Sequence, residues 1–288
     1  MQSTPEEPTC PPKALVAAED RCGPLSIEAI THRRQTAVWK ADGPRGSVAI
    51  KVGYADAAET TLREAAVLDA LPGYTATFDT EGNLAWLVTP WHSGPTTWQR
   101  FDDFRQLGTG RRHALTAAID LCDSIRDLHR GGWIHSDLQP DHVIHTEHGV
   151  RLIDWTWAWR ASFPQHRAFR GGIPHLLAPE LAATITTGTR PVQPTSQAEV
   201  YTLAACLWRC ATGNWPLDYQ AVGINLEDMT AADLRAQIAT GTIPLTSTTD
   251  WPELQKLLRL HLTPHPADRL PLSALGDELR RLRRVSLS

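Results

Sequence analysis

Two aspartates near the middle of the chain stand in a context that suits phosphoryl transfer. Asp137 lies in a polar stretch that runs from His135 to His142, and Asp154 directly follows the apolar pair Leu152-Ile153. One carboxylate on a loop can orient a hydroxyl nucleophile, while another at the end of a strand can hold a metal ion on a phosphate. The spacing therefore predicts a phosphoryl-transfer site, which the surrounding elements must position.

A long amphipathic helix is predicted directly before this loop, from Arg112 to Arg130. Apolar residues recur there at steps of three or four, as expected for one buried helix face. They are Leu115, Ile119, Cys122, Ile125 and Leu128. Gly131-Gly132 ends the helix. The loop with Asp137 would then follow a buried helix, which is a common support for catalytic residues.

The first third of the chain has a different pattern, in which short alternating segments predict strands. These segments are Ile27–Ile30, Ala37–Ala41, Ser47–Val52 and Leu84–Thr89, with a turn at 42–46. In the third segment, alternation puts Val48, Ile50 and Val52 on one face and Ala49 and Lys51 on the other. Lys51 would be either an edge residue or a functional cation.

A helix is predicted from Ala55 to Leu71, ended by Pro72-Gly73. Glu64 lies near its apolar stripe. It could be a solvated surface residue, or it could pair with Lys51 across a contact between strand and helix.

Composition changes define three regions. Residues 1–24 are rich in proline without periodicity and predict a flexible or surface-hugging leader. Residues 25–91 form a small β-rich part, and the break from Pro90 to Gly94 leads to a helical part at 92–288. The apolar segment from Glu199 to Thr212 is expected to be the core helix of that part.

Charge and cysteine content indicate an ordinary soluble protein of the cytoplasm. A net charge of −4 and a pI near 6.3 give no general attraction to nucleic acid or to an anionic membrane. No apolar run is long enough to span a bilayer. The five cysteines lack paired spacing, which fits a reducing compartment. The basic cluster at residues 280–284 is typical of a solvated helix face, although it could contact an acidic partner.

Taken in order from Ile27 to Arg269, these residues resemble the protein-kinase superfamily. The matching motifs are Val48-Ala49-Ile50-Lys51, Glu64, His135-Ser136-Asp137, Asp154, Ala178-Pro179-Glu180 and Arg269. The resemblance implies an α+β, bilobal protein kinase-like fold. It has a small β-rich N-lobe with one helix and a large, mainly helical C-lobe.

The resemblance also implies roles for individual residues. Lys51 would hold the phosphates of ATP and pair with Glu64, Asp137 would be the catalytic residue at the acceptor hydroxyl, and Asp154 would bind Mg²⁺ or Mn²⁺. Thr89 and Trp91, at the end of the last strand, would contact the nucleotide. Glu180 would pair with Arg269.

Several positions depart from the family pattern. The nucleotide-covering loop corresponds to Thr31–Thr36, which contains no glycine, so Arg33 or Arg34 would supply charge where amides usually approach phosphate. His142 stands where the family has asparagine as the second metal ligand, and imidazole suits softer metals than Mg²⁺. Gln139 replaces a lysine, and Ser136 replaces the arginine that usually receives a phosphorylated loop.

Trp155, Trp157 and Trp159 alternate along the chain, so in an extended strand they would share one face. That face could be buried, or it could be a ledge for a peptide or partner protein. Trp155-Thr156 replaces the Phe-Gly of the family motif, so the Asp154 segment should flip less easily.

The leading hypothesis is an ATP-dependent kinase that acts on Ser or Thr hydroxyls of a protein or peptide. A narrower hypothesis is a kinase of a class V lanthipeptide-type pathway, in which a partner enzyme then eliminates the phosphate. The alternatives are a pseudokinase that serves as a nucleotide- or partner-binding scaffold, and a small-molecule phosphotransferase.

Overall fold

The computed structural model describes residues 9–163, 165–247 and 250–285. The chain divides into two compact units, Met1–His92 and Ser93–Ser288. The β-rich part was expected to end at residue 91, one residue before this division.

The first unit is built on an antiparallel five-stranded sheet with strand order β1-β2-β3-β5-β4. Its strands are β1 (Ser26–Arg33), β2 (Thr36–Gly43), β3 (Gly46–Tyr54), β4 (Thr77–Glu81) and β5 (Leu84–Pro90). The sequence predicted all of them except β4. That strand is a largely exposed edge strand with the sequence Thr-Phe-Asp-Thr-Glu, so its apolar alternation is weak.

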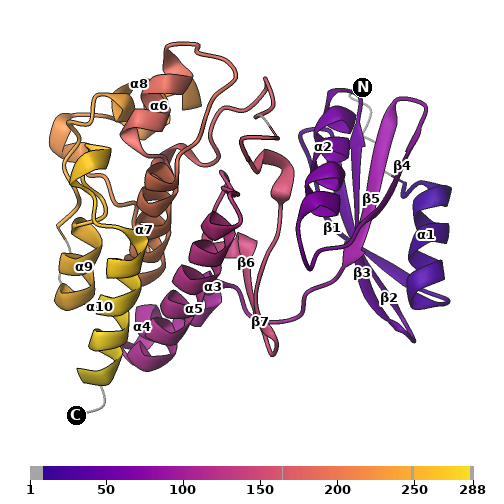
Figure 1. Cartoon of the computed structure of the whole chain (residues 1–288), viewed down its shortest axis with the longest axis horizontal. Helices are drawn as coiled ribbons and strands as arrows, with labels where there is room; N and C mark the ends of the chain where they lie inside the picture. Colours follow the sequence, from indigo (N-terminus) through magenta and orange to yellow (C-terminus); the bar gives the residue numbers. More distant parts are fainter. Residues whose placement is uncertain (1–8, 164, 248–249, 286–288) are drawn as a thin grey trace. The chain divides into compact units, whose positions relative to one another are not determined.

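Helices α1 (Pro12–Cys22) and α2 (Asp56–Ala70) cover opposite faces of this sheet (Figure 1). The side chains of Val48, Ile50 and Val52 are buried in one cluster with α1, as alternation predicted. Lys51 points to the other face, on which α2 packs.

Helix α1 corrects the prediction for the N-terminal region. A flexible leader over residues 1–24 is wrong for Pro12–Cys22, and residues 1–8 lie outside the described part of the chain. Proline is well tolerated in the first helical turn. Ala14, Ala18 and Cys22 recur every four residues and are almost fully buried against the sheet. These side chains are so small that the stripe carries little hydropathy signal. The described part of the first unit contains two helices, α1 and α2, where one was expected.

The second unit is mainly helical. Its helices are α3 (Thr97–Arg100), α4 (Asp102–Leu107), α5 (Arg111–Arg130), α6 (Pro179–Thr186), α7 (Ser196–Thr212), α8 (Ala231–Ala239), α9 (Pro252–Arg259) and α10 (Leu272–Val285). A small hairpin joins β6 (Val143–Thr146) and β7 (Gly149–Leu152). Most of α7 is buried, which confirms it as the core helix. Cys206 and Cys210 lie in it as free thiols that are buried in the core.

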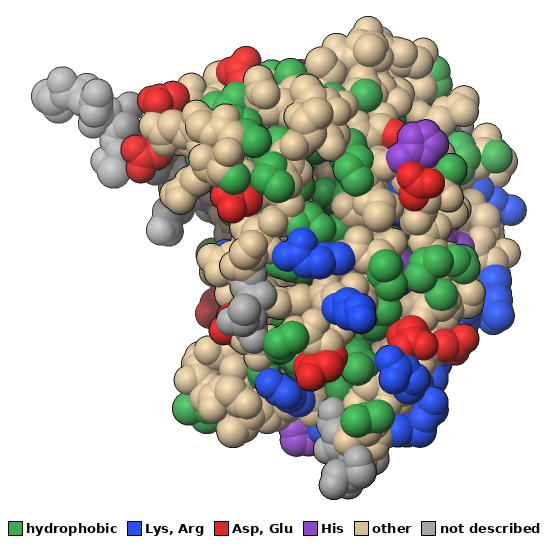
Figure 2. Space-filling view, turned by 90° about the vertical axis from the view of Figure 1, so that its left-hand side faces the viewer, with side chains coloured by type: hydrophobic (Ala, Val, Ile, Leu, Met, Phe, Trp, Pro, Cys, Tyr) green, Lys and Arg blue, Asp and Glu red, His purple; other side chains and the backbone are tan. Residues whose placement is uncertain are grey.

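The basic cluster on α10 is partly used within the chain. Arg280 donates to both carboxylate oxygens of Asp123 on α5, and Arg281 Nε donates to Glu278 Oε2 at 2.7 Å. Figure 2 shows acidic, basic and apolar side chains interspersed on the lower part of one face. The cluster therefore has partners of its own, and it gives no separate evidence for an acidic partner protein.

The tryptophan-rich segment is not an extended strand, so the prediction of one shared tryptophan face is wrong. Trp155–Trp157 form a 3-10 helix, and Trp159 then pairs with Ile134 in an isolated bridge. Asp154 has a left-handed conformation with φ 61°, which turns the chain just before this helix. Trp155 is buried, with Nε1 donating to the carbonyl of Leu152 at 3.0 Å.

None of the described helices combines the length and apolar character needed to cross a bilayer.

Candidate active site

In the first unit, Lys51 and Glu64 form a close ion pair between β3 and α2. Lys51 Nζ lies 2.5 Å from Glu64 Oε2, and Glu64 is only 5% exposed. Gly53 allows the strand to approach the helix, because a Cβ there would lie 2.2 Å from the Ala57 carbonyl oxygen. Glu64 is therefore not a solvated surface residue, and it fixes the position of the lysine ammonium.

Thr89 and Trp91 lie at and just beyond the end of β5. Thr89 is paired with Ala49 in the sheet, so it shares the sheet face of Lys51. The Trp91 backbone N–H donates to Ser47 O at 3.0 Å, and Lys40 Nζ lies 5.4 Å from the centre of the Trp91 ring. These contacts fix Trp91 at the end of the sheet.

The segment predicted as a six-residue nucleotide loop is a tight hairpin turn. Strand β1 continues to Arg33 and β2 starts at Thr36, so only Arg34 and Gln35 lie between the strands. Both have left-handed φ values, 51° and 61°. Such turns favour glycine or asparagine, because other residues are strained there. Arg33 and Arg34 are both exposed, so their charges are available to a ligand.

In the second unit, the loop with Asp137 follows α5 and is held by a buried carboxylate on α7. Glu199 is 3% exposed, and its Oε1 accepts the Ser136 backbone N–H at 2.9 Å. Its Oε2 lies 2.7 Å from His129 Nε2 on α5. Ser136 has a left-handed φ of 66°, which costs about 1 kcal/mol for a residue other than glycine. Glu199 stabilises this conformation directly before Asp137.

His135 packs under the loop and is fully buried. Its Nε2 lies 3.0 Å from the Ile153 carbonyl, and its ring centre lies 4.7 Å from that of Trp155. Burial lowers the pKa of His135 to about 4, so the ring is neutral near pH 7. Through its contacts with Ile153 and Trp155, the neutral ring joins the Asp137 loop to the segment that carries Asp154.

Asp137 is 8% exposed. Its Oδ1 accepts Gln139 Nε2 at 2.9 Å, so the residue that replaces the family lysine contacts the aspartate directly. Gly172 lies against the same oxygen, because a Cβ on Gly172 would be 1.8 Å from it. Any side chain at position 172 would therefore displace the carboxylate.

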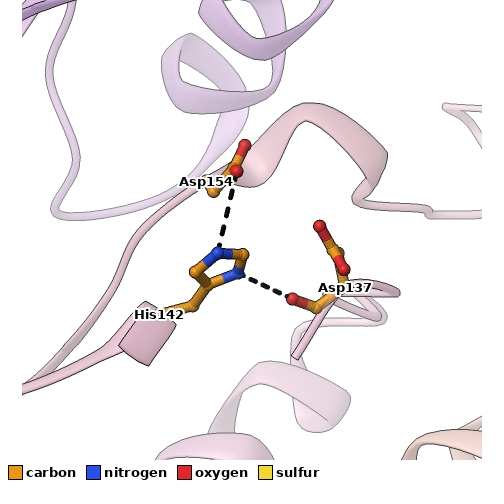
Figure 3. A group of neighbouring side chains, drawn as sticks. All are labelled: Asp137, His142 and Asp154. Carbon is orange, nitrogen blue, oxygen red and sulfur yellow. Dashed lines mark hydrogen bonds and ion pairs between the residues drawn. The ribbon is translucent and has the colours of Figure 1, made fainter. Parts of the chain in front are cut away.

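Asp137, His142 and Asp154 come together in space (Figure 3). One ligating atom from each lies within 4.8 Å of the others. His142 Nδ1 is 2.9 Å from the Asp137 backbone oxygen, and Nε2 is 3.8 Å from Asp154 Oδ2. Thr156 Oγ1 donates to Asp154 Oδ1 at 3.0 Å. Two carboxylates and an imidazole in this arrangement fit a divalent cation.

The buried Arg269 forms a two-pronged ion pair with the partly exposed Glu180, with N–O distances of 2.5 and 2.7 Å. Arg269 also donates to the carbonyls of Thr263, Pro264 and Gln197. The pairing implied by the family resemblance is present, and it fixes the start of α6.

No family model matches the sequence, but several curated proteins are similar to it. The chain is 29% identical over 266 residues to the serine/threonine-protein kinase PkaB of Streptomyces coelicolor, covering 85% of this chain and 59% of that protein. It is 27% identical over 218 residues to PknK of Mycobacterium tuberculosis, covering 70% of this chain and 17% of PknK. It is 28% identical over 181 residues to AfsK of Streptomyces griseus, covering 59% of this chain and 21% of AfsK.

The chain thus spans about six tenths of PkaB and about a fifth of PknK and AfsK. The β-rich and helical units agree with the predicted α+β kinase-like fold. The fold, the motif order and these similarities support a divergent protein kinase-like superfamily relationship for the chain.

Proposed function

We propose that the chain is an ATP-dependent kinase that transfers the γ-phosphate to Ser or Thr hydroxyls of a protein or peptide. The observation that carries this proposal is the cluster of Asp137, His142 and Asp154 on a loop held by Glu199. The relatives support kinase activity in general, because all three are named serine/threonine-protein kinases.

In this reaction the residues divide the work. Lys51, oriented by Glu64, binds the phosphates of ATP, and Asp137 orients the acceptor hydroxyl and takes up its proton as the phosphate bond forms. Arg33 or Arg34 adds positive charge near the phosphates, and Thr89 and Trp91 contact the rest of the nucleotide.

Asp154 and His142 would hold a divalent cation, for which their donor atoms fit. When bound, such an ion neutralises charge on the phosphoryl oxygens. Asp137 lies beside it with one oxygen held by Gln139, which fixes the direction of the carboxylate.

A small hollow beside Asp137 is lined mainly by apolar side chains. Its apolar lining comes from the catalytic loop, the segment before α6, and α6 itself: Ile134, Leu138, Ile173, Leu176, Leu177 and Leu181. A narrower form of the proposal is a precursor peptide of a natural-product pathway, with a partner enzyme that eliminates the phosphate.

The decisive test is phosphoryl transfer by Asp137→Ala. Transfer of ³²P from labelled ATP to a general Ser/Thr substrate or to the chain itself should fall by about 10²–10⁴-fold, because the general base is lost. Binding of ATP, measured by thermal shift, should persist. Asp141→Asn is a matched control, since Asp141 is exposed and its Oδ1 accepts Thr96 Oγ1 at 3.0 Å. Equal transfer by Asp137→Ala and the unaltered chain would refute the role of Asp137.

The main alternative is a pseudokinase scaffold, motivated by the glycine-free, left-handed turn at Arg34-Gln35. A thermal-shift experiment with ATP and with Mg²⁺, Mn²⁺ or no metal distinguishes the two. No shift under any condition would favour the scaffold. The second alternative, a small-molecule phosphotransferase, predicts ADP release only with a small acceptor.

A further inference from the structure

The imidazole of His142 has a defined tautomer in this structure. Its Nδ1 lies 2.9 Å from the backbone carbonyl oxygen of Asp137. A carbonyl oxygen only accepts hydrogen bonds, so Nδ1 must carry the hydrogen and donate it. In the neutral ring, Nε2 is then left with a lone pair.

That lone pair faces another electron-rich atom. Nε2 lies 3.8 Å from Oδ2 of Asp154, and the His142 side chain is only 13% exposed. The distance is too long for a direct hydrogen bond. Two atoms that each bind one ion at about 2.1 Å lie about 3.0 Å apart at a right angle and about 4.2 Å apart on opposite sides. The observed separation falls between these limits, as expected for two ligands of one cation.

The hydrogen bond at Nδ1 matches the usual support of a metal-binding histidine. Such a ring donates its second N–H to a carboxylate, a carbonyl or water, which fixes its orientation and raises the basicity of the ligating nitrogen. Here Nδ1–H of His142 donates to the backbone carbonyl of Asp137, the proposed catalytic residue. The imidazole is thus oriented before any metal arrives.

A nitrogen ligand changes which metal is favoured. Mg²⁺ prefers oxygen donors in a strict octahedron, whereas first-row transition ions bind imidazole more strongly. We infer that His142 binds the metal through Nε2, and that the site favours a first-row transition cation such as Mn²⁺ over Mg²⁺. This inference rests on the proposed function for its biological setting, but the metal site can be tested without catalysis.

The direct test is pulsed EPR of the full chain with Mn²⁺ and ADP. We expect hyperfine coupling from a directly bound ¹⁴N nucleus, and its loss in His142→Asn, which restores an oxygen donor at this position. His148→Asn is the matched control, because His148 lies on the β6–β7 turn with 80% of its side chain exposed. It should keep the coupling.

An isotope exchange covers the case in which His142→Asn fails to fold. Growth with ¹⁵N-histidine should replace the ¹⁴N coupling by a ¹⁵N coupling in the unaltered sequence. Absence of any coupled nitrogen, or coupling that survives in folded His142→Asn, would overturn the inference.

Metal competition gives a second readout. The Mg²⁺ concentration that displaces half of the bound Mn²⁺ should fall about tenfold in His142→Asn, and an unchanged value would count against the inference. Nitrogen coupling without any phosphoryl transfer would keep the inference and refute the kinase proposal. Transfer supported by Mg²⁺ in a chain without nitrogen coupling would keep the kinase proposal and refute the inference.

Discussion

The Asp137 loop and the β1–β2 turn both contain residues other than glycine with left-handed φ values, but they are held differently. At Ser136 the backbone N–H is bound by Glu199, a carboxylate on a buried helix. At Arg34 and Gln35 the turn is exposed, and a bond from the Tyr54 N–H to the Gln35 carbonyl is one contact that holds it. Strain that is supported by buried contacts is a better sign of function than strain on an exposed turn.

Removing the support of the Asp137 loop should have the largest effect. Glu199→Ala deletes a buried carboxylate that accepts from Ser136 and contacts His129. We expect a loss of about 3 kcal/mol in the free energy of unfolding, because a charged hydrogen bond is lost and a strained N–H is left without its acceptor. Urea denaturation measures this loss.

Glu278→Ala is the control for that variant. Glu278 pairs with Arg281 on α10, and its side chain is 44% exposed. Its removal should change stability by less than about 0.5 kcal/mol. Equal effects of the two variants would show that the Asp137 loop needs no support from Glu199.

A smaller effect is expected from acidification, and it again concerns buried contacts of the second unit. Burial lowers the pKa of His145 to about 4, and its Nε2 lies 2.9 Å from Thr97 Oγ1. Because this pKa is below the unfolded value of about 6.5, the unfolded chain takes up a proton that the folded chain excludes as pH falls. Stability from this ring should drop by about 1 kcal/mol between pH 6.5 and 5.5.

Thermal melts across that pH range measure the effect. His145→Asn should make the dependence shallower by the share of this ring, and the remainder should persist because burial also lowers the pKa values of His135 and His175. His148→Asn should leave the dependence unchanged. A melting temperature that stays constant from pH 7 to pH 5 would contradict a neutral, buried His145.

The smallest effect is expected at the turn, and it has the opposite sign. Arg34→Gly should stabilise the chain by roughly 0.5–1 kcal/mol, because glycine adopts the left-handed conformation without strain. Arg33→Gly should destabilise it, since Arg33 lies within β1. A loss of stability in Arg34→Gly would mean that the arginine side chain holds the turn.

Much of the fold was predictable, because most strands and the long helix before Asp137 carry clear apolar periodicity. Helix α1 was missed because its buried stripe consists of alanine and cysteine. The alternation of the tryptophans predicts a strand, whereas the left-handed Asp154 starts a 3-10 helix. The sequence reveals the motif, but it does not reveal the backbone angle at Asp154 that changes the direction of the chain.

For the site, the family motifs named the charged residues in advance. The pairing of Lys51 with Glu64 depended on the correct registers of β3 and α2, which the sequence alone left open. The contact between Gly172 and Asp137 joins residues far apart in the chain, and neither local pattern nor propensity indicates it. Likewise, the tautomer of His142 follows from a backbone carbonyl whose position only the folded loop defines.

The packing of α1 has a consequence for shortened versions of the protein. Trp39, Ile50, Val52 and Trp86 lie in the same buried cluster as Ala14, Ala18 and Cys22. A recombinant chain that starts at Leu25, where the strands begin, would expose this aromatic and aliphatic surface to water. Exposed patches of this kind promote self-association. Soluble expression and reliable assays therefore require the residues that precede the first strand.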